Sequence, residues 1–186
     1  MAEWSQKLDT MQHYNLTAKS YDALYAEEQK MKIEVALGKV ELKAESLILD
    51  CGCGTGLLFE YVSSKAKMVV GLDISKGILK EAKKRARKFG NVHLVLADAD
   101  YMPLKDGVFS HAFAVTLLQN MPNPEGTLAE LVRVAGKKGF IVVTGLKKKF
   151  SLKFLEGLLL KYKLNVIEIV NGNEALKCHV AVCVKS

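Results

Sequence analysis

The chain lacks any long apolar run. None of its apolar stretches reaches the roughly 18 residues that a helix needs to cross a bilayer. The first part of the chain, Met1 to Asp22, is polar and mixed in charge, without the apolar core of a secretory signal. We therefore expect no membrane insertion and a cytoplasmic location.

The sequence also has few features that would indicate disulfides or a metal centre. Its four cysteines, Cys51, Cys53, Cys178 and Cys183, include no C-x-x-C pair. No group of histidines, cysteines and acids has metal-ligand spacing. We expect reduced thiols and no metal. No pair of residues stands out as a catalytic base, so the catalytic residues stay unknown at this stage.

What is present is an ordinary globular composition with a basic balance. The 186 residues are 49% hydrophobic and 25% charged, enough for one domain with a real core. The net charge of +7 favours anionic partners without identifying one. Much of this charge falls in residues 76–89 at helical spacing, which we interpret as a solvated helix face. A second basic run is Lys147, Lys148 and Lys149.

The most informative segment is Leu47 to Gly56, where an apolar run ends in Asp50 and glycines follow at positions 52, 54 and 56. It predicts a buried strand and then a turn where the backbone approaches a ligand closely. The dinucleotide fingerprint G-x-G-x-x-G would place glycine at position 57, but Leu57 is there. This spacing argues against a nicotinamide dehydrogenase.

Strand and helix patterns alternate after residue 46, which predicts a Rossmann-like α/β fold. We expect a doubly wound, seven-stranded, mostly parallel sheet with an antiparallel last strand, because no helix fits between the last two strands. The turn Asn171 to Asn173 would join them. His111 and His179 lie in strands and are interpreted as structural. The expected strands are 46–49, 67–72, 92–96, 109–115, 140–144, 166–170 and 179–184, and the expected helices are 18–42, 57–64, 76–89, 124–134 and 151–162.

These motifs, in this order, resemble the class I S-adenosylmethionine-dependent methyltransferases over residues 46–184. The resemblance implies that S-adenosyl-L-methionine is the cofactor and S-adenosyl-L-homocysteine the product. One departure is Phe109-Ser110, where the family usually has Phe-Asp, at a position that is generally structural. The cofactor residues that the resemblance implies are Asp50, Gly52, Gly54 and Gly56 at the methionine end, Asp73 with Ile74 at the ribose, Asp98 and Ala99 at the adenine, and Thr116 after the fourth strand.

Each acid also has a simpler interpretation. Asp50 would cap the turn that follows it, Asp73 would cap the helix that starts near Ser75, and Asp98 would be an ordinary loop acid.

Residues 1–45 stand outside the alternation and resemble the tyrosine-bearing lid of many small family members, ahead of a catalytic domain at 46–186. In this interpretation Tyr14 and Tyr21 contact the cofactor and close the site to water. The alternative is that Tyr14, Tyr21 and Tyr25, which are seven and four residues apart, share one face and dock a helix on the core.

The acceptor is the least determined part. Gln119-Asn120-Met121-Pro122 is not the Asn/Asp-Pro-Pro-aromatic motif of enzymes that methylate base amines or glutamine amides. Gln119, Asn120 and Tyr25 are substrate candidates, although the first two would also serve simply to satisfy the loop backbone.

We expect RNA or a translation-related protein as acceptor, with Lys147, Lys148 and Lys149 as phosphate contacts. The alternatives are a small molecule such as a quinone precursor, or a non-catalytic S-adenosylmethionine-binding module. Some related small enzymes work with a small zinc-containing activator subunit, so the resemblance also implies such a subunit as a candidate partner.

Overall fold

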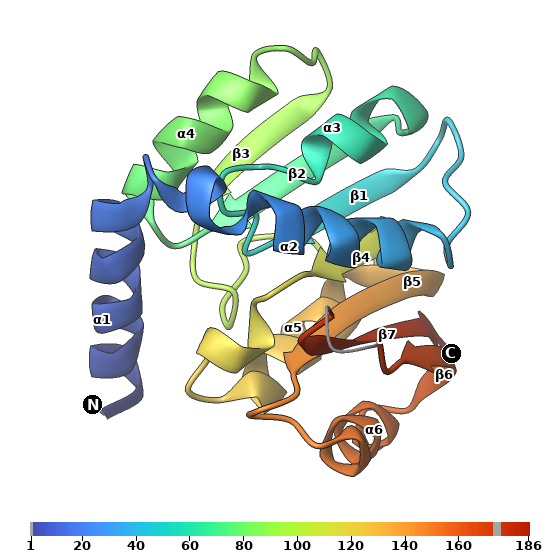
Figure 1. The fold of residues 1–186 in the computed structure, drawn as a ribbon. Helices are drawn as coiled ribbons and strands as arrows, with labels where there is room; N and C mark the ends of the chain where they lie inside the picture. Colours follow the sequence, from blue (N-terminus) through green and yellow to red (C-terminus); the bar gives the residue numbers. More distant parts are fainter. Residues whose placement is uncertain (1, 173–175) are drawn as a thin grey trace.

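A mixed sheet of seven strands forms the centre of the molecule (Figure 1), in the order β3-β2-β1-β4-β5-β7-β6. The computed structural model describes residues 2–172 and 176–186. The strands are β1 Leu47–Cys51, β2 Met68–Asp73, β3 Val92–Leu96, β4 Phe109–Ala114, β5 Ala135–Leu146, β6 Leu164–Val170 and β7 Cys178–Lys185. The helices are α1 Ala2–Thr17, α2 Tyr21–Leu37, α3 Phe59–Val62, α4 Lys76–Ala86, α5 Pro124–Val134 and α6 Leu152–Lys161, with short 3-10 turns η1 Ser63–Lys65 and η2 Leu118–Asn120.

The topology confirms the predicted fold class. Strands β1 to β5 run parallel to one another, and β7 lies antiparallel between β5 and β6. The strand order reverses between β1 and β4, so the crevice beyond their carboxyl ends is the place where this kind of sheet binds ligands. The predicted turn Asn171 to Asn173 reaches residue 173, which lies outside the described residues.

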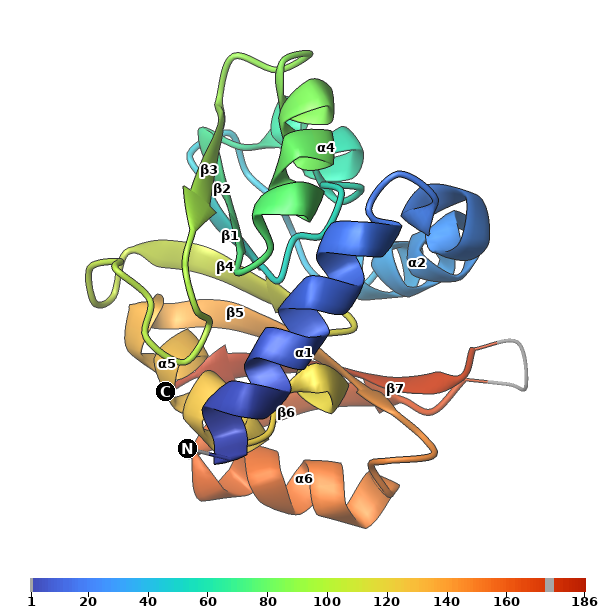
Figure 2. The same ribbon diagram turned by 90° about the vertical axis from the view of Figure 1, so that its left-hand side faces the viewer.

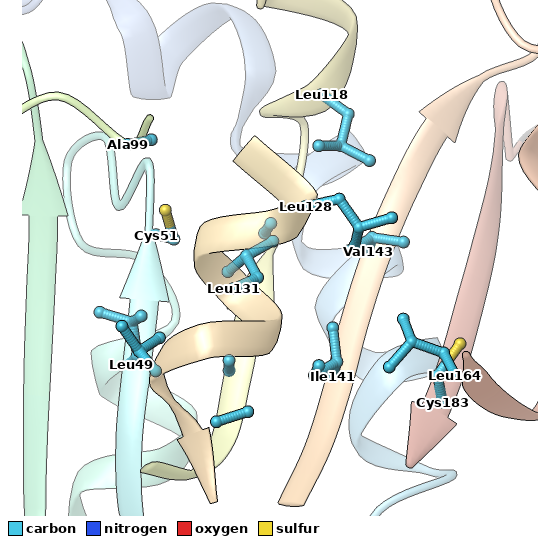
Figure 3. Close-up of a cluster of buried hydrophobic side chains, with 14 of the residues drawn as sticks. Leu49, Cys51, Ala99, Leu118, Leu128, Leu131, Ile141, Val143, Leu164 and Cys183 are labelled. Atoms are coloured by element: carbon cyan, nitrogen blue, oxygen red, sulfur yellow. The ribbon is translucent and has the colours of Figure 1, made fainter. Parts of the chain in front are cut away.

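Each face of the sheet carries its own apolar layer, because successive strand residues point to opposite sides. Ile48 packs with α2, α3 and α4, whereas its neighbour Leu49 packs with α5 and α6. Figure 3 shows the second layer, in which Leu128 and Leu131 of α5 face the strands. Both layers are closed to water, so the sheet is a rigid support for the loops at its edge.

Side-chain caps set the starts of three helices. The hydroxyl of Ser75 accepts a hydrogen bond from the N–H of Ile78 at 3.2 Å and begins α4. Ser151 caps α6 in the same way, and Asn123 caps α5 just before Pro124. These caps satisfy N–H groups that a helix start leaves without partners, which explains why the predicted starts of α4 and α5 hold.

Most boundaries differ from the prediction by a few residues, and two differences affect the argument. Strand β5 begins at Ala135 rather than at residue 140, because Ala135 already pairs with Phe109 before an irregularity in which Lys138 takes a φ of 60°. The segment expected as one helix over 18–42 begins only at Tyr21, and α1 precedes it. Tyr14 therefore lies on α1, while Tyr21 and Tyr25 lie on α2. The alternative in which all three tyrosines share one face of a single helix was wrong.

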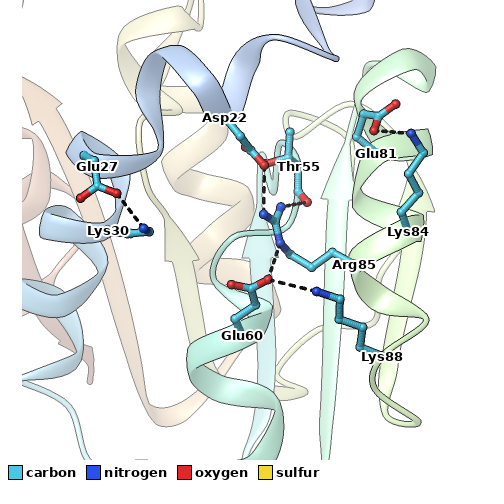
Figure 4. A network of polar contacts seen from close by, with 9 residues as sticks. All are labelled: Asp22, Glu27, Lys30, Thr55, Glu60, Glu81, Lys84, Arg85 and Lys88. Atoms are coloured by element: carbon cyan, nitrogen blue, oxygen red, sulfur yellow. Dashed lines mark hydrogen bonds and ion pairs between the residues drawn. The ribbon is translucent and has the colours of Figure 1, made fainter.

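The basic helix α4 is mostly solvated, as expected, with one exception. Arg85 donates to Glu60 at 2.8 Å, to Asp22 at 2.9 Å and to the carbonyl of Thr55 at 2.7 Å (Figure 4). The hydroxyl of Thr55 in turn donates to Asp22 at 2.6 Å. Arg85 thus ties α2, α3 and the glycine loop together.

Within the described ranges, every helix is too short or too polar to cross a membrane.

Candidate cofactor site

A cleft opens beyond the carboxyl ends of β1, β2 and β4. Helix α1 runs across these strand ends (Figure 2), and its residues Lys7, Thr10 and Tyr14 line the cleft. The residues that line it are Lys7, Thr10, Tyr14, Tyr21, Gly52, Gly54, Leu72, Asp73, Ile74, Ile78, Ala97, Asp98, Ala99, Val115, Thr116, Leu117, Asn120 and Met121.

The glycine loop meets the cleft at Gly54. Its φ is +54°, and nothing lies within 4 Å of the point where a Cβ would stand, so the loop leaves open space for a ligand. Gly56, with a φ of +79°, has a different role, because a methyl group there would overlap the ring of Phe59. Gly56 does not line the cleft; it allows the loop to pack.

Asp73 ends β2 with its carboxylate at the cleft. One oxygen accepts the N–H of Gly54 at 3.0 Å and the other accepts the N–H of Ser75 at 2.9 Å. Burial raises the pKa of this carboxyl, and the backbone donors oppose the rise. Since the side chain of Ser75 caps α4, Asp73 is not needed as that cap, and it instead connects the two loops that line the cleft.

Asp50 faces a second, smaller hollow that continues the cleft under α2. The two hollows share Tyr21, Gly52, Gly54 and Val115. Asp50 is only 4% exposed, and burial, with the nearby charge of Asp73, raises its pKa to about 8. A cation placed in this hollow would favour the ionised form of Asp50.

Asp98 lies at the opposite end of the cleft, where Lys7 of α1 meets it. The ammonium of Lys7 lies 2.9 and 2.7 Å from the two oxygens of Asp98 and 2.5 Å from an oxygen of Asp100. These bonds raise the pKa of Lys7 against the opposing effect of burial. Asp98 is therefore more than a loop acid, because it anchors the N-terminal helix to the edge of the sheet where the parallel strands end.

Two tyrosines complete the wall. Tyr14 of α1 and Tyr21 of α2 both line the cleft, with ring centroids 5.9 Å apart. Tyr25 packs against Tyr21 with ring centroids 5.1 Å apart, but it is 44% exposed and lies outside both hollows.

The loop after β4 supplies the other two substrate candidates. Asn120 lines the cleft, whereas Gln119 turns inward and is 8% exposed. The geometry thus favours Asn120 over Gln119 and Tyr25 as a substrate contact.

Thr116 holds an unusual conformation at the end of β4. Its φ is +63°, which is rare for a β-branched residue. Its N–H donates to Thr144 at 2.7 Å, and its hydroxyl meets Lys32 at 3.0 Å and Gln29 at 2.8 Å. Lys32 is 1% exposed and pairs with Glu28 at 2.7 Å. A buried network from α2 therefore holds the backbone of this residue in place.

Three strand residues that the sequence indicated as structural, His111, His179 and Ser110, lie outside the cleft. His111 is buried and bonds to the carbonyl of Glu41 at 3.0 Å, and burial lowers its pKa, which confirms a core histidine. His179 is buried in β7 beside the carbonyl of Phe150. Ser110 bonds to the backbone of Leu47 on β1, so it serves the sheet where the family usually has an acid.

Sequence reasoning missed several residues of the site, above all Lys7, Gln29 and Lys32. No local pattern distinguishes these residues from surface residues, since each gains its role from a partner far along the chain. The cleft-lining positions Thr10, Ile78 and Met121 were missed for the same reason.

Comparison with known proteins agrees with this geometry. The methyltransferase domain family matches residues 49–143. A malonyl-[acyl-carrier protein] O-methyltransferase from Marinomonas sp. is 31% identical over 77% of this chain and 54% of its own length. A demethylmenaquinone methyltransferase from Tropheryma whipplei is 34% identical over 52% of this chain and 40% of its own. The chain spans about half the length of the curated relatives it matches.

A solved structure has the same fold. It is a Haloferax volcanii protein described as a putative methyltransferase in complex with the Trm112 methyltransferase activator. Its TM-score is 0.83 at 14% identity, and the match covers 92% of this chain and 97% of that one. The family match and the sheet order together establish the class: the chain belongs to the methyltransferase domain family, with the Rossmann-like fold of class I S-adenosylmethionine-dependent methyltransferases.

Proposed function

We propose that the chain transfers a methyl group from S-adenosylmethionine to a small organic acceptor. The observation that carries this proposal is the cleft itself. It gathers Gly54, Asp73 and Asp98, which come from three separate motifs, around open space at the switch point of the sheet. A Cβ at position 54 would enter that space, so the loop fits a ligand at close range.

The residues divide the cleft into three parts. Asp73 offers carboxylate oxygens to ribose hydroxyls, and Asp98 with Ala99 meets the adenine. Gly54 and the hollow beside Asp50 take the methionine end, where the cofactor's amino group would favour an ionised Asp50. When bound, the cofactor supplies a methyl group that its sulfonium has already activated.

The chain's own task is then positioning. Tyr14, Tyr21 and α1 narrow the cleft and exclude water, and Thr116 and Asn120 fix the edge on which an acceptor would rest. In-line displacement needs alignment more than acid–base chemistry, so a general base is required only for an acceptor that holds its proton tightly.

A small acceptor is favoured over RNA or a translation-related protein. The two relatives described above are named for a malonyl group and for demethylmenaquinone. Within the chain, Lys147 donates to the carbonyl of Gly172 at 2.9 Å and Lys149 to that of Gln119 at 2.7 Å. Two of the three expected phosphate contacts are thus engaged in holding the strand-end loops.

Calorimetry tests the cofactor first. S-adenosylmethionine and S-adenosylhomocysteine should bind, and NAD should not; binding of NAD alone would overturn the proposal. Labelled S-adenosylmethionine is then incubated with cell extract separated into small-molecule, RNA and protein pools. Label in the small-molecule pool supports the proposal, label in RNA or protein restores the other acceptor, and binding without transfer indicates a non-catalytic module.

An activator subunit remains a prediction. The Haloferax protein of similar fold was solved with the Trm112 activator, which supports testing an activator of that kind here. The chain would be expressed alone and together with the activator, and co-purification with a gain in label transfer would support the partner. Equal activity in both preparations would argue against it.

A further inference from the structure

The two cleft tyrosines have hydroxyl protons that the protein does not use. Tyr14 and Tyr21 each accept a hydrogen bond from a side-chain amide, at 3.1 and 3.4 Å. Among the described residues, neither phenol donates to an acceptor. The direction of each bond can be worked out from a neighbour whose role is fixed.

For Tyr21 the fixed point is Lys32, because an ammonium can only donate. Lys32 donates to the hydroxyl oxygen of Thr116, and the single proton of Thr116 is donated to the amide oxygen of Gln29, 2.8 Å away. With its oxygen on Thr116, the amide of Gln29 turns its nitrogen to Tyr21, whose oxygen accepts at 3.4 Å. The hydroxyl proton of Tyr21 is left for the cleft.

For Tyr14 the fixed point is the backbone carbonyl of Thr116, which can only accept. It lies 2.9 Å from the amide nitrogen of Asn120, so that nitrogen and not the amide oxygen faces it. The same nitrogen lies 3.1 Å from the oxygen of Tyr14. Tyr14 therefore accepts as well, and its hydroxyl proton is also left for the cleft.

Both phenols keep these protons under ordinary conditions. Burial raises the pKa of Tyr14 and of Tyr21, and the charge of Asp73 adds to both rises. The rings are close together, 5.9 Å between centroids, on two different helices that meet at the cleft. The fold thus presents two neutral donors side by side, with no matching acceptor between them in the described part of the chain.

We infer that Tyr14 and Tyr21 form a two-donor site for an anionic oxygen of the methyl acceptor, as in a carboxylate, a phenolate or an enolate. The inference rests on the proposed function and deepens it by naming the chemical class of the acceptor. An amine would be poorly served, because a protonated amine only donates, and the lone pair of a neutral one must face the methyl group. The two donors therefore select against nitrogen acceptors.

The test uses 4-nitrophenolate as a coloured anionic probe of the protein loaded with S-adenosylhomocysteine. Binding should shift its absorbance, and Tyr14→Phe and Tyr21→Phe should each weaken that binding at least about tenfold, since each removes a hydrogen bond to a charged group. Tyr162→Phe, at the end of α6 and outside the cleft, is the matched control and should bind as the parent does.

A second variant keeps both phenols but directs the hydroxyl proton of Tyr21 away from the cleft. Gln29→Glu has nearly the same shape, but its carboxylate would accept from both Thr116 and Tyr21. The Tyr21 proton would then point into the network, so the affinity for 4-nitrophenolate should fall as in Tyr21→Phe. Unchanged affinity in Gln29→Glu and in both phenylalanine variants would overturn the inference.

The other source of an anionic oxygen is the amino-acid carboxylate of the cofactor. Methylthioadenosine, which lacks that carboxylate, distinguishes a role of the tyrosines in binding the acceptor from a role in binding the cofactor. If the phenylalanine variants weaken binding of S-adenosylhomocysteine but not of methylthioadenosine, and leave 4-nitrophenolate unaffected, the donors serve the cofactor and the inference is wrong. If S-adenosylhomocysteine does not bind the unaltered protein at all, the proposed function fails instead.

Discussion

Lys7 holds both carboxylate oxygens of Asp98, at 2.9 and 2.7 Å from its ammonium nitrogen, although 91 residues separate the two along the chain. The same ammonium lies 5.6 Å from the ring centroid of Tyr101. At the other end of α1, the side-chain oxygen of Asn15 accepts from Ser75 at 2.8 Å and from the N–H of Gly77 at 2.7 Å. Polar anchors at two points thus hold α1 across the cleft.

The first prediction concerns this anchoring. Lys7→Met keeps the apolar stem but leaves Asp98 and Asp100 close together without their cation. We expect α1 to open more readily, with the free energy of its local opening lower by about 1–3 kcal/mol. Hydrogen exchange over residues 2–17 measures this. Lys30→Met removes an exposed ion pair with Glu27 and should leave that exchange unchanged; equal effects would refute a special role for Lys7.

The second prediction is a pH dependence of stability from Asp50. Its pKa is about 8 in the folded chain against an ordinary value of 3.8, so between these values the folded chain holds a proton that the unfolded chain has lost. The free energy of unfolding should therefore fall as the pH rises from about 4 to about 8, and level off above that. Urea unfolding across this range should show the fall in the parent and a weaker one in Asp50→Asn. Parallel curves would mean that Asp50 does not titrate there.

The third prediction compares two glycines of one loop. Gly54→Ala should cost only roughly 1–2 kcal/mol of stability, from its positive φ, because its methyl group meets open space. That methyl group enters the cleft, so binding of S-adenosylhomocysteine should be largely lost. Gly56→Ala should lose more stability, because its methyl group overlaps Phe59. Thermal unfolding and calorimetry separate the two effects, and tight binding by Gly54→Ala would contradict the proposed position of the ligand.

The fourth prediction isolates the hydroxyl of Thr116. Thr116→Val keeps the branched shape and the same backbone strain but removes the partner of buried Lys32 and of Gln29. We expect a loss of about 1–3 kcal/mol in the free energy of unfolding, because buried Lys32 keeps only its bond to Glu28 and the amide oxygen of Gln29 loses its donor. Thr116→Ser keeps the hydroxyl and should lose less. Similar losses in the two variants would show that the methyl group, not the network, matters.

The parts of the site that were predictable from the sequence are those encoded locally. Gly52, Gly54, Asp73, Asp98 and Ala99 all line the cleft, because each lies at the end of a strand or within three residues of it, and parallel strands end at one edge. Their predicted position at the cleft is confirmed, and their contacts with the cofactor are part of the proposed function. Asn120 was found for the same reason, since it follows β4.

What could not be predicted depends on contacts between distant segments. Helix α1 has no apolar stripe that distinguishes it from a polar terminus, and it is held by Lys7 and Asn15 rather than by a core of its own. The early start of β5 depends on a pairing with Phe109 that no local pattern contains. Lys32 would be expected on a surface, and only its pairing with Glu28 and Thr116 makes its burial tolerable.

The four cysteines have a practical consequence. All are free and buried, and burial raises the pKa of each thiol, so the reactive thiolate is scarce at neutral pH. A thiol-directed fluorophore should therefore ignore the native chain. A single Gln12→Cys change on the exposed side of α1 would then carry the dye alone, and the opening of that helix could be followed in real time without first removing any natural cysteine.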